Sequence, residues 1–497
     1  MSDNFILILD FGGPNARKMA RRLRANGYYC ELQPHTVEPA IIEKKDPNGL
    51  IFAGDCLEVS FNEALLASDR PKLALGSSAR RIMAIVGAKR KSIQLANRAA
   101  QIQFLPCPLF EDLSESNHYF ERIDDYELPE GTEPIAWADQ GVCAGYHTAR
   151  MDLYGLQFYP ETNDPDGTQI LMNFAANICR CAQTWSPDTY IKNETEFLKA
   201  RIGEKNCIAA ITGSIESAVC AALLKKAFGG QVRFITVDTG CLTKNEAESI
   251  RNEYLEHLNI DVEIVDCSRQ VISQISGISS AREKRTIIEN AVHTSIADAV
   301  KSMPDVSFIL FATTYTSLLE YPEQLTTLGR HFDGVECLYP LRMLFYDEIR
   351  EIAASIQLPD IFIDRQPFPM AGLAAYCVGP VTESKLEMLR EADHILHMEM
   401  QESGYQKKRL QYYPVLTNMC SPSQNAAHST PEYTCILRVY QAYSTDSTES
   451  PARLPYDLLA RLVEQIVRQV PGINHVLYDI TAGTGDVFEP EEPTRGA

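Results

Sequence analysis

One stretch of sequence decides the fold of the middle of the chain: Cys207-Ile208-Ala209-Ala210-Ile211-Thr212-Gly213-Ser214-Ile215-Glu216-Ser217-Ala218. It joins a short apolar run, typical of a buried strand, through a glycine turn to a helix predicted over residues 215–227. Another apolar run follows at 232–238, and two more follow at 262–265 and 307–312. Apolar runs that alternate with helical stretches predict βαβ units and a parallel sheet.

The same alternation occurs toward the N-terminus, where the apolar residues 5–10 precede a helical pattern. The strand-like runs that follow are 28–32, 49–53 and 72–75. After Pro-Phe-Pro at 367–369, strand-like runs mix with two amphipathic helices, predicted over 383–402 and 455–470. We therefore predict an α/β chain of three domains, with the boundaries 1–185, 186–370 and 371–497.

Composition indicates a folded, acidic protein. Of 497 residues, 45% are hydrophobic, and 66 acidic against 46 basic residues give a formal charge of −20. This charge argues against a nucleic-acid backbone or an anionic membrane as the main partner. The chain has no apolar run of 18 residues, and its first residues lack the basic segment of a signal peptide, so we expect a cytoplasmic protein. Its 14 cysteines lack zinc-site spacing, so we expect reduced thiols and no metal ligands.

Three short motifs in the first domain point to one family. They are Ile8-Leu9-Asp10-Phe11-Gly12, Phe52-Ala53-Gly54-Asp55 and Tyr154-Gly155-Leu156-Gln157-Phe158-Tyr159-Pro160-Glu161. Together they resemble the class I glutamine amidotransferase domain of the GMP synthase family. There the last motif reads Y-G-V-Q-F-H-P-E, and its His and Glu complete a Cys-His-Glu triad. The resemblance implies a flavodoxin-like fold for this domain.

The catalytic positions of that family hold other residues here. Its nucleophile elbow, G-V-C-Y-G-M-Q, corresponds to Ala74-Leu75-Gly76-Ser77-Ser78-Ala79-Arg80, so the Cys position is Gly76. The His position is Tyr159, whose phenol is a poor base at neutral pH, and only Glu161 is retained. We therefore predict that the domain does not hydrolyse glutamine. A changed amidase with another nucleophile is the alternative; the candidates are Ser77, Ser78 and Cys56.

The loop at 212–218 resembles the S-G-G-x-D-S-S loop of the family's ATP-pyrophosphatase domain, whose fold is that of the adenine nucleotide α-hydrolases. Such a loop binds phosphate through backbone N–H groups and hydroxyls at a helix N-terminus. Here Ser214 replaces a Gly, Glu216 replaces the Asp, and Ala218 replaces a Ser. The resemblance implies ATP and Mg²⁺ as cofactors, and the changes predict weak or lost binding. The predicted nucleotide-site residues are Thr212, Gly213, Ser214, Glu216, Ser217 and Asp238.

Later segments extend the resemblance over nearly the whole chain. They are Lys284-Arg285-Thr286-Ile287-Ile288, Leu338-Tyr339-Pro340-Leu341, Phe345-Tyr346-Asp347-Glu348-Ile349-Arg350 and Arg365-Gln366-Pro367-Phe368-Pro369. The family's basic lid is reduced to 329–335, where Arg330 and His331 are candidates for substrate binding. The alternative for these two residues is an ordinary solvated loop.

The third domain resembles the small α+β dimerisation domain of the same family. The matching segments lie at 454–461 and 470–481. A lysine that would meet a phosphate in the family corresponds to Gly483, whereas Arg438 is retained and is a third substrate-binding candidate. The motifs that build the scaffold are therefore kept, whereas the motifs that carry reactive residues are changed.

The resulting hypothesis is a GMP synthase-like protein with both active sites disabled. It would act through binding, as a homodimer or as a heterodimer with a genuine GMP synthase, and a purine nucleotide is a possible ligand. The main alternative is an ammonia-dependent ligase that still uses ATP, with XMP or another acceptor, and it rests on the loop at 212–217 and on Asp238. Activity of a changed amidase remains a third possibility.

Overall fold

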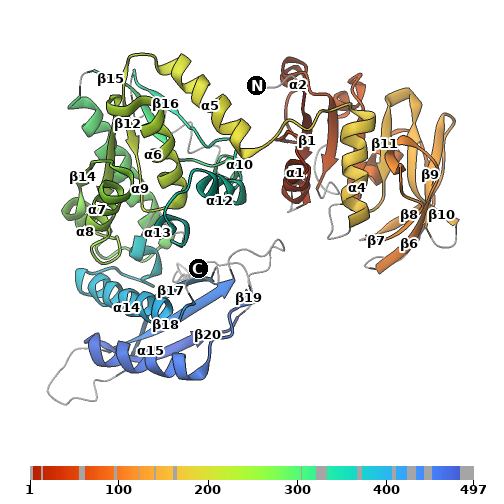
Figure 1. The fold of residues 1–497 in the computed structure, drawn as a ribbon. Helices are drawn as coiled ribbons and strands as arrows, with labels where there is room; N and C mark the ends of the chain where they lie inside the picture. Colours follow the sequence, from red (N-terminus) through yellow and green to blue (C-terminus); the bar gives the residue numbers. More distant parts are fainter. Residues whose placement is uncertain are drawn as a thin grey trace, which may run out of the picture. The chain divides into compact units, whose positions relative to one another are not determined.

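The computed structural model describes residues 4–12, 15–54, 62–94, 98–120, 122–138, 141–160, 165–303, 305–320, 332, 334–366, 372–405, 410–421, 432–441 and 450–481. Its internal contacts divide the chain into two compact units, Met1–Tyr190 and Ile191–Ala497 (Figure 1). The division of the sequence into three domains stays a prediction. Across the described ranges, no helix is both long and apolar enough to cross a membrane.

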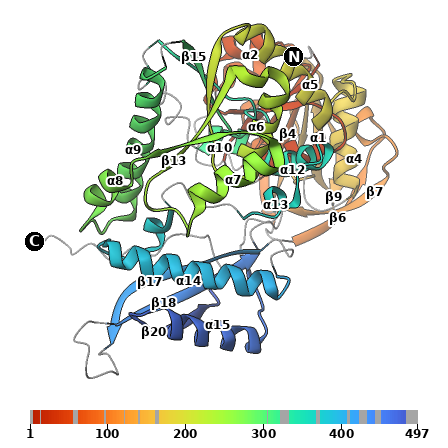
Figure 2. The same cartoon turned by 60° about the vertical axis from the view of Figure 1, so that its left-hand side comes forward.

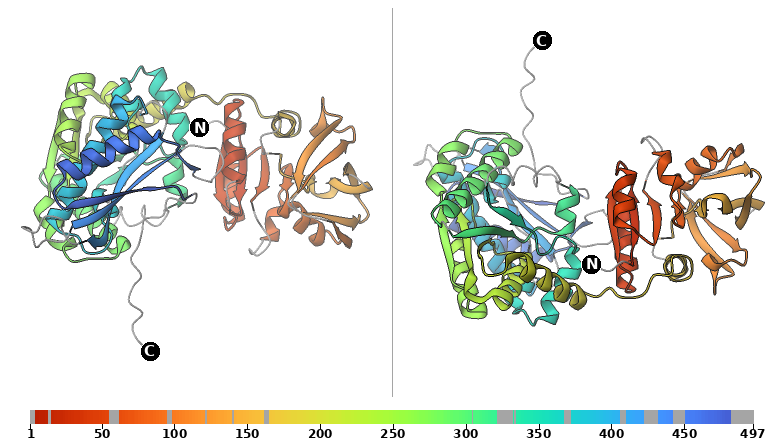
Figure 3. Two further views of the ribbon diagram at one scale, coloured as in Figure 1. Left: turned by 90° about the horizontal axis from the view of Figure 1, so that it is seen from below. Right: turned by 90° about the horizontal axis from the view of Figure 1, so that it is seen from above.

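A nine-stranded sheet forms the centre of the first unit, in the order β2-β1-β3-β4-β11-β10-β9-β6-β7 (Figure 3). Neighbours from β2 to β11 are parallel, and the pairs from β11 to β7 are antiparallel. Its strands are β1 (Ile6–Asp10), β2 (Cys30–Pro34), β3 (Gly49–Ala53), β4 (Lys72–Leu75), β6 (Arg98–Phe104), β7 (Glu115–Phe120), β9 (Thr132–Ala138), β10 (Val142–Thr148) and β11 (Leu153–Leu156). A separate antiparallel pair consists of β5 (Lys89–Gln94) and β8 (Ile123–Glu127).

The helices of this unit pack on the parallel part of the sheet. Helix α1 contacts β1, β2 and α4, and α3 contacts β3, β4 and β11. Strands β3 and β4 are buried along their whole length, as expected for central parallel strands. The α-helices are α1 (Asn15–Ala25), α2 (Pro39–Lys45), α3 (Ser77–Ile85), α4 (Pro165–Asn173) and α5 (Pro187–Ile202), which runs into the second unit. Short helical turns are η1 (Glu63–Ala67), η2 (Pro108–Phe110), η4 (Ala149–Met151) and η5 (Phe174–Ile178).

The second unit holds a five-stranded, wholly parallel sheet in the order β14-β13-β12-β15-β16. This confirms the α/β class and the parallel sheet predicted from the sequence. The strands are β12 (Asn206–Ala210), β13 (Val232–Asp238), β14 (Val262–Asp266), β15 (Val306–Phe311) and β16 (Glu336–Leu338). The helices around them are α6 (Ile215–Phe228), η6 (Gly229–Gln231), α7 (Glu246–Leu258), α8 (Ser268–Ile275), α9 (Ala281–Lys301), α10 (Tyr315–Glu320), α12 (Tyr346–Ser355) and α13 (Asp360–Ile363).

The C-terminal part of this unit is a small sheet with two long helices, and α14 and α15 contact each other and the sheet (Figure 2). Strand β18 pairs with β17 and β19 in antiparallel and with β20 in parallel. The elements are η7 (Gly372–Tyr376), α14 (Glu383–Glu402), β17 (Leu410–Ser421), β18 (Glu432–Gln441), β19 (Ser450–Pro451), α15 (Tyr456–Gln469) and β20 (Ile473–Asp479). One apolar cluster joins Ile288 of α9 with Leu389 of α14 and Val415 of β17, so this part shares a core with the helices of the parallel sheet.

Candidate functional site

The first candidate site is the turn between β4 and α3, where the sequence predicts a nucleophile elbow. Gly76 stands at this turn with φ +54° and ψ −117°, and its N–H donates to the carbonyl of Leu156 at 2.8 Å. Such angles lie in a region that residues other than glycine adopt only at a cost. The strained strand-to-helix turn of an elbow is therefore present, but the residue at its apex has no side chain.

The ring of Tyr159 fills the space in which a nucleophile would stand. A Cβ atom built on Gly76 would lie 2.1 Å from Cζ and 2.4 Å from the phenolic oxygen of Tyr159. Carbon atoms that are not bonded to each other pack at about 3.5–4 Å, so a cysteine or serine side chain cannot occupy this position while the ring is there. Tyr159 is itself 6% exposed. The two changed catalytic positions are thus in direct contact.

The phenol also engages the backbone group that follows the elbow. The N–H of Ser77 donates to the Tyr159 hydroxyl at 3.3 Å. In an elbow, the N–H of the residue after the nucleophile stabilises the developing oxyanion of the substrate. Here that N–H is bonded to a side chain of the protein. The predicted triad position Glu161 lies outside the described residues.

The alternative nucleophiles are not arranged for attack in the described part of the chain. The Ser77 hydroxyl donates to the carbonyl of Gly54 at 3.0 Å, and both Ser77 and Ser78 are fully buried. Because a serine needs a base within hydrogen-bond reach, a hydroxyl that donates to a carbonyl oxygen is not activated. Cys56 lies outside the described residues.

The second candidate site is the loop between β12 and α6, and its donors are bonded within the loop. The N–H of Thr212 donates to Ser217 Oγ at 3.0 Å, and the N–H of Ser214 donates to Thr212 Oγ1 at 3.3 Å. The N–H of Ser217 donates to Ser214 Oγ at 3.3 Å, which caps helix α6. The predicted hydroxyl-bearing residues are therefore brought together, but they bond to one another.

Arg365 lies against Gly213 on the other side of this loop. Its Nη1 donates to the Gly213 carbonyl at 3.2 Å, and its Nη2 pairs with Glu253 at 2.9 Å. A Cβ atom built on Gly213 would lie 2.3 Å from Nη1. Neither charged residue is among those predicted for the site from the sequence, although Arg365 opens a segment that matches the family. The pairing could not be found from sequence because Glu253 stands far away on α7.

Two carboxyl groups belong to the surroundings of this loop, and burial disfavours the charged form of each. Glu216 is half-buried, and burial raises its pKa, whereas hydrogen bonds from its own N–H and from Ser214 act in the opposite direction. Burial also raises the pKa of Glu253, although the guanidinium of Arg365 opposes this effect. Asp238 ends β13 and accepts a hydrogen bond from the N–H of Gly240 at 2.8 Å.

Three N–H groups of this loop are occupied by hydroxyl oxygens of the loop itself. Phosphate binding at a helix N-terminus needs N–H groups that point at the ligand. The N–H groups of Thr212, Ser214 and Ser217 already have acceptors, and the carboxyl group of Glu216 belongs to the same turn. Within the described ranges, no three His, Cys, Asp or Glu side chains are grouped in a way that could hold a metal ion.

The third set of candidates contains the predicted substrate-binding residues, and of these the structure describes only Arg438. Arg438 on β18 forms an ion pair with Asp479 of β20 at 3.0 Å, and its Nη1 donates to the hydroxyl of Tyr413 at 3.1 Å. Its guanidinium also lies over the rings of Tyr413 and Tyr440. These contacts join the strands of the C-terminal sheet. The other predicted substrate-binding residues, Arg330 and His331, lie outside the described residues, as does Gly483.

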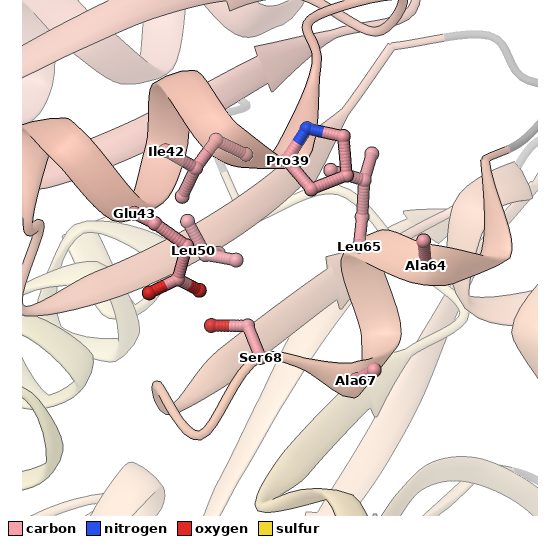
Figure 4. Close-up of a pocket in the computed structure, with 8 residues that line it drawn as sticks. All are labelled: Pro39, Ile42, Glu43, Leu50, Ala64, Leu65, Ala67 and Ser68. Atoms are coloured by element: carbon pink, nitrogen blue, oxygen red, sulfur yellow. The ribbon is translucent and has the colours of Figure 1, made fainter.

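A small hollow of the first unit is lined by other residues. It is formed by α2, β3 and η1, and Figure 4 shows its lining. Glu43 and Ser68 are its polar groups, and the remaining lining side chains are apolar or proline. None of the predicted site residues lines it.

Comparison with known proteins agrees with the resemblance found in the sequence. Residues 398–487 match the GMP synthase C terminal domain. The chain is 31% identical to GMP synthase [glutamine-hydrolyzing] of Caldanaerobacter subterraneus over 96% of this chain and 97% of the relative. It is 32% identical to the protein of the same name from Bacillus subtilis, over 97% of each. The Sulfurimonas denitrificans protein of that name is 31% identical over 97% of this chain and 98% of the relative. Similarity at this level over nearly the full length shows that the chain belongs to the GMP synthase family.

Proposed function

We propose that this chain is a GMP synthase-like protein that does not hydrolyse glutamine and that acts by binding rather than by turnover. Its relatives are named as glutamine-hydrolysing GMP synthases, and this similarity supports the family reaction, in which XMP, ATP and glutamine give GMP. The proposal is that the fold and its binding surfaces are kept while both reactive centres are changed. A cytoplasmic location belongs to the same proposal.

The observation that carries the proposal is the contact between Gly76 and Tyr159. The chemistry of the family needs a thiolate at the first position and an imidazole at the second. Glycine supplies no nucleophile, and the phenol ring lies 2.1 Å from the point where the Cβ atom of a nucleophilic residue would stand. Loss of a triad nucleophile alone costs about a million-fold in turnover in proteases.

The middle domain supports the second half of the proposal. Its loop donors are bonded internally, and an arginine paired with Glu253 lies against Gly213. We propose that ATP and Mg²⁺ bind weakly or not at all in this arrangement. An ammonia-dependent ligase would need the loop to open and Arg365 to move.

The C-terminal part offers a surface for a second chain. Tyr456 of α15 is 83% exposed, and Leu477 and Ile480, in β20 and just after it, are also exposed apolar residues. In the described part of the chain, β20 pairs with β18 alone. Exposed apolar side chains beside a strand edge are typical of association surfaces. We propose a dimer, either of two identical chains or with a catalytically complete GMP synthase.

The first experiment is an assay of GMP formation by the purified full-length protein with XMP, ATP and Mg²⁺, once with saturating ammonium and once with glutamine. The relative from Bacillus subtilis is assayed in parallel as the active control. We expect no GMP from this chain with either nitrogen source. Ammonium bypasses the first unit and therefore tests the second unit alone.

Turnover with ammonium that disappears in Glu216→Ala would show a working ligase, and it would refute the proposal for the second unit. Release of glutamate from glutamine would refute the proposal for the first unit. If that release is lost in Ser77→Ala, the changed amidase is the correct interpretation. Sedimentation of the protein alone and mixed with a genuine synthase tests the dimer, which is wrong if every sample is monomeric.

A further inference from the structure

Arg80 is a buried cation in the first unit, one turn after Gly76 on α3. Only 4% of its surface is exposed. Its Nη1 donates to the carbonyl of Arg122 at 2.8 Å and lies 3.5 Å from that of Gln157. Its Nε and Nη2 are also buried, and neither has a hydrogen-bond partner among the described residues. These two donors form one edge of the guanidinium, which is the edge that binds a carboxylate through two parallel hydrogen bonds.

Asp124 is a buried carboxylate of the same unit, and its partners are other residues than Arg80. Asp124 accepts two hydrogen bonds from Arg122, at 2.7 and 2.8 Å, and one from the hydroxyl of Tyr126 at 3.1 Å. Arg90 adds a further cation at 3.7 Å. Among the described residues, Arg80 has no carboxylate within ion-pair distance. The charge of Asp124 is therefore balanced by other arginines, and the charge of Arg80 is not balanced by Asp124.

An unpaired guanidinium is costly in the interior of a protein. Buried charges are paired or hydrogen-bonded as a rule, and a buried donor without an acceptor loses its hydration without compensation. Water could accept hydrogen bonds from the two N–H groups, but it would not neutralise the positive charge of the guanidinium. A small planar anion with two oxygens satisfies both, because its oxygens have the spacing of the Nε and Nη2 donors.

Ser78 supplies a second observation of the same kind. It stands two residues before Arg80 in the first turn of α3 and is fully buried, and its hydroxyl has no hydrogen-bond partner in the part of the chain that the structure describes. The related family pattern has Gly at this position and Gln at the position of Arg80. The first change adds a hydroxyl to the interior and the second adds a charge. The described residues provide no partner for the Ser78 hydroxyl or for two of the Arg80 nitrogens.

We propose that Arg80 binds a small carboxylate, of the size of formate or acetate, through Nε and Nη2 inside the first unit. We propose a small ligand because both donors are buried. The site lies beside the closed elbow, and it does not depend on whether the second unit turns over nucleotide.

The test uses the full-length protein and acetate as the probe. Binding is measured by line broadening of ¹³C-acetate and by the thermal transition of the first unit, at constant ionic strength with chloride as the replacement anion. Both tryptophans, Trp137 and Trp185, lie in this unit, so their fluorescence reports its unfolding alone. We expect saturable binding of acetate at one site, from which formate displaces it. We also expect the temperature of the thermal transition to increase with acetate concentration but not with chloride concentration.

The matched variants are Arg80→Gln and Arg81→Gln, which remove neighbouring arginines of the same helix. Arg80→Gln should weaken acetate binding at least tenfold, and Arg81→Gln should leave it unchanged. If Arg80→Gln does not fold, Arg80→Lys is used, since an ammonium cannot form the two-bonded pair and should also weaken binding. Acetate without effect, chloride with the same effect as acetate, or equal binding by both variants would overturn the proposal.

Discussion

Gly76→Ala should destabilise the first unit far more than an ordinary glycine substitution. Two costs are added in this variant. The angles φ +54° and ψ −117° are unfavourable for alanine by about 1–3 kcal/mol. The new Cβ would also lie 2.1 Å from the ring of Tyr159, and forcing an extra carbon into a packed interior costs about 1–3 kcal/mol. We expect a total loss of about 2–6 kcal/mol in the free energy of unfolding.

The assay is urea unfolding followed by tryptophan fluorescence, because Trp137 and Trp185 both report on this unit. Gly87→Ala is the matched control. Gly87 also has a positive φ, of +89°, but a Cβ atom there meets nothing within 4 Å. It should cost only the backbone strain of about 1–2 kcal/mol.

A double-mutant cycle with Tyr159→Ala separates the two costs of Gly76→Ala. When the ring is absent, the new methyl group has space, and only the backbone strain is left. We expect a coupling energy of about 1–3 kcal/mol between the two positions. If Gly76→Ala costs the same with and without Tyr159, the ring does not occupy the nucleophile's space, and the explanation of the closed elbow is wrong.

Two further predictions concern the second unit. Lys284→Met removes an ammonium that donates to the buried carbonyls of Cys377 at 2.6 Å and Gly379 at 2.7 Å. It should lower the free energy of unfolding, measured in urea, by about 2–3 kcal/mol. The control is Lys301→Met on the exposed end of α9, which should change the free energy of unfolding little. For His397, burial lowers the pKa, but the carboxylate of Asp393 outweighs this effect, so the pKa is raised above 6.5. The stability that His397 gives over His397→Gln should therefore be full below pH 6.5 and lost as the pH rises through the higher pKa of the folded state. A stability difference that grows with pH would contradict this prediction.

The fold followed from the sequence because its signals are local. The apolar run at 207–211 and the glycine turn after it are visible in one short stretch, and the parallel sheet follows from the alternation of such runs with helices. The absence of a side chain at Gly76 was equally visible in the sequence. What could not be seen was the position of the replacement at Tyr159, because that ring reaches Gly76 only through the pairing of β4 with β11.

Arg365 and Glu253 show the same limit in the second unit. Each is an ordinary charged residue in the sequence, and more than a hundred positions separate them. Their ion pair at 2.9 Å against Gly213 exists only because α7 and the segment after α13 both pass beside the loop. Contacts between distant residues are fixed by tertiary packing, and a single sequence carries no local signal for them.

The geometry at the elbow also predicts that one substitution alone does not give the first unit the cysteine and the histidine of the family motif. Gly76→Cys alone would place its side chain in the ring of Tyr159, and the resulting clash opposes folding before any chemistry is possible. Tyr159→His alone would remove the phenol ring but leave no nucleophile for the imidazole to activate. Each single change therefore costs stability or packing without giving activity, and only the pair returns both groups to the turn. The ring of Tyr159 occupies the space that glycine leaves free at position 76, so the closed geometry of this site depends on both residues together.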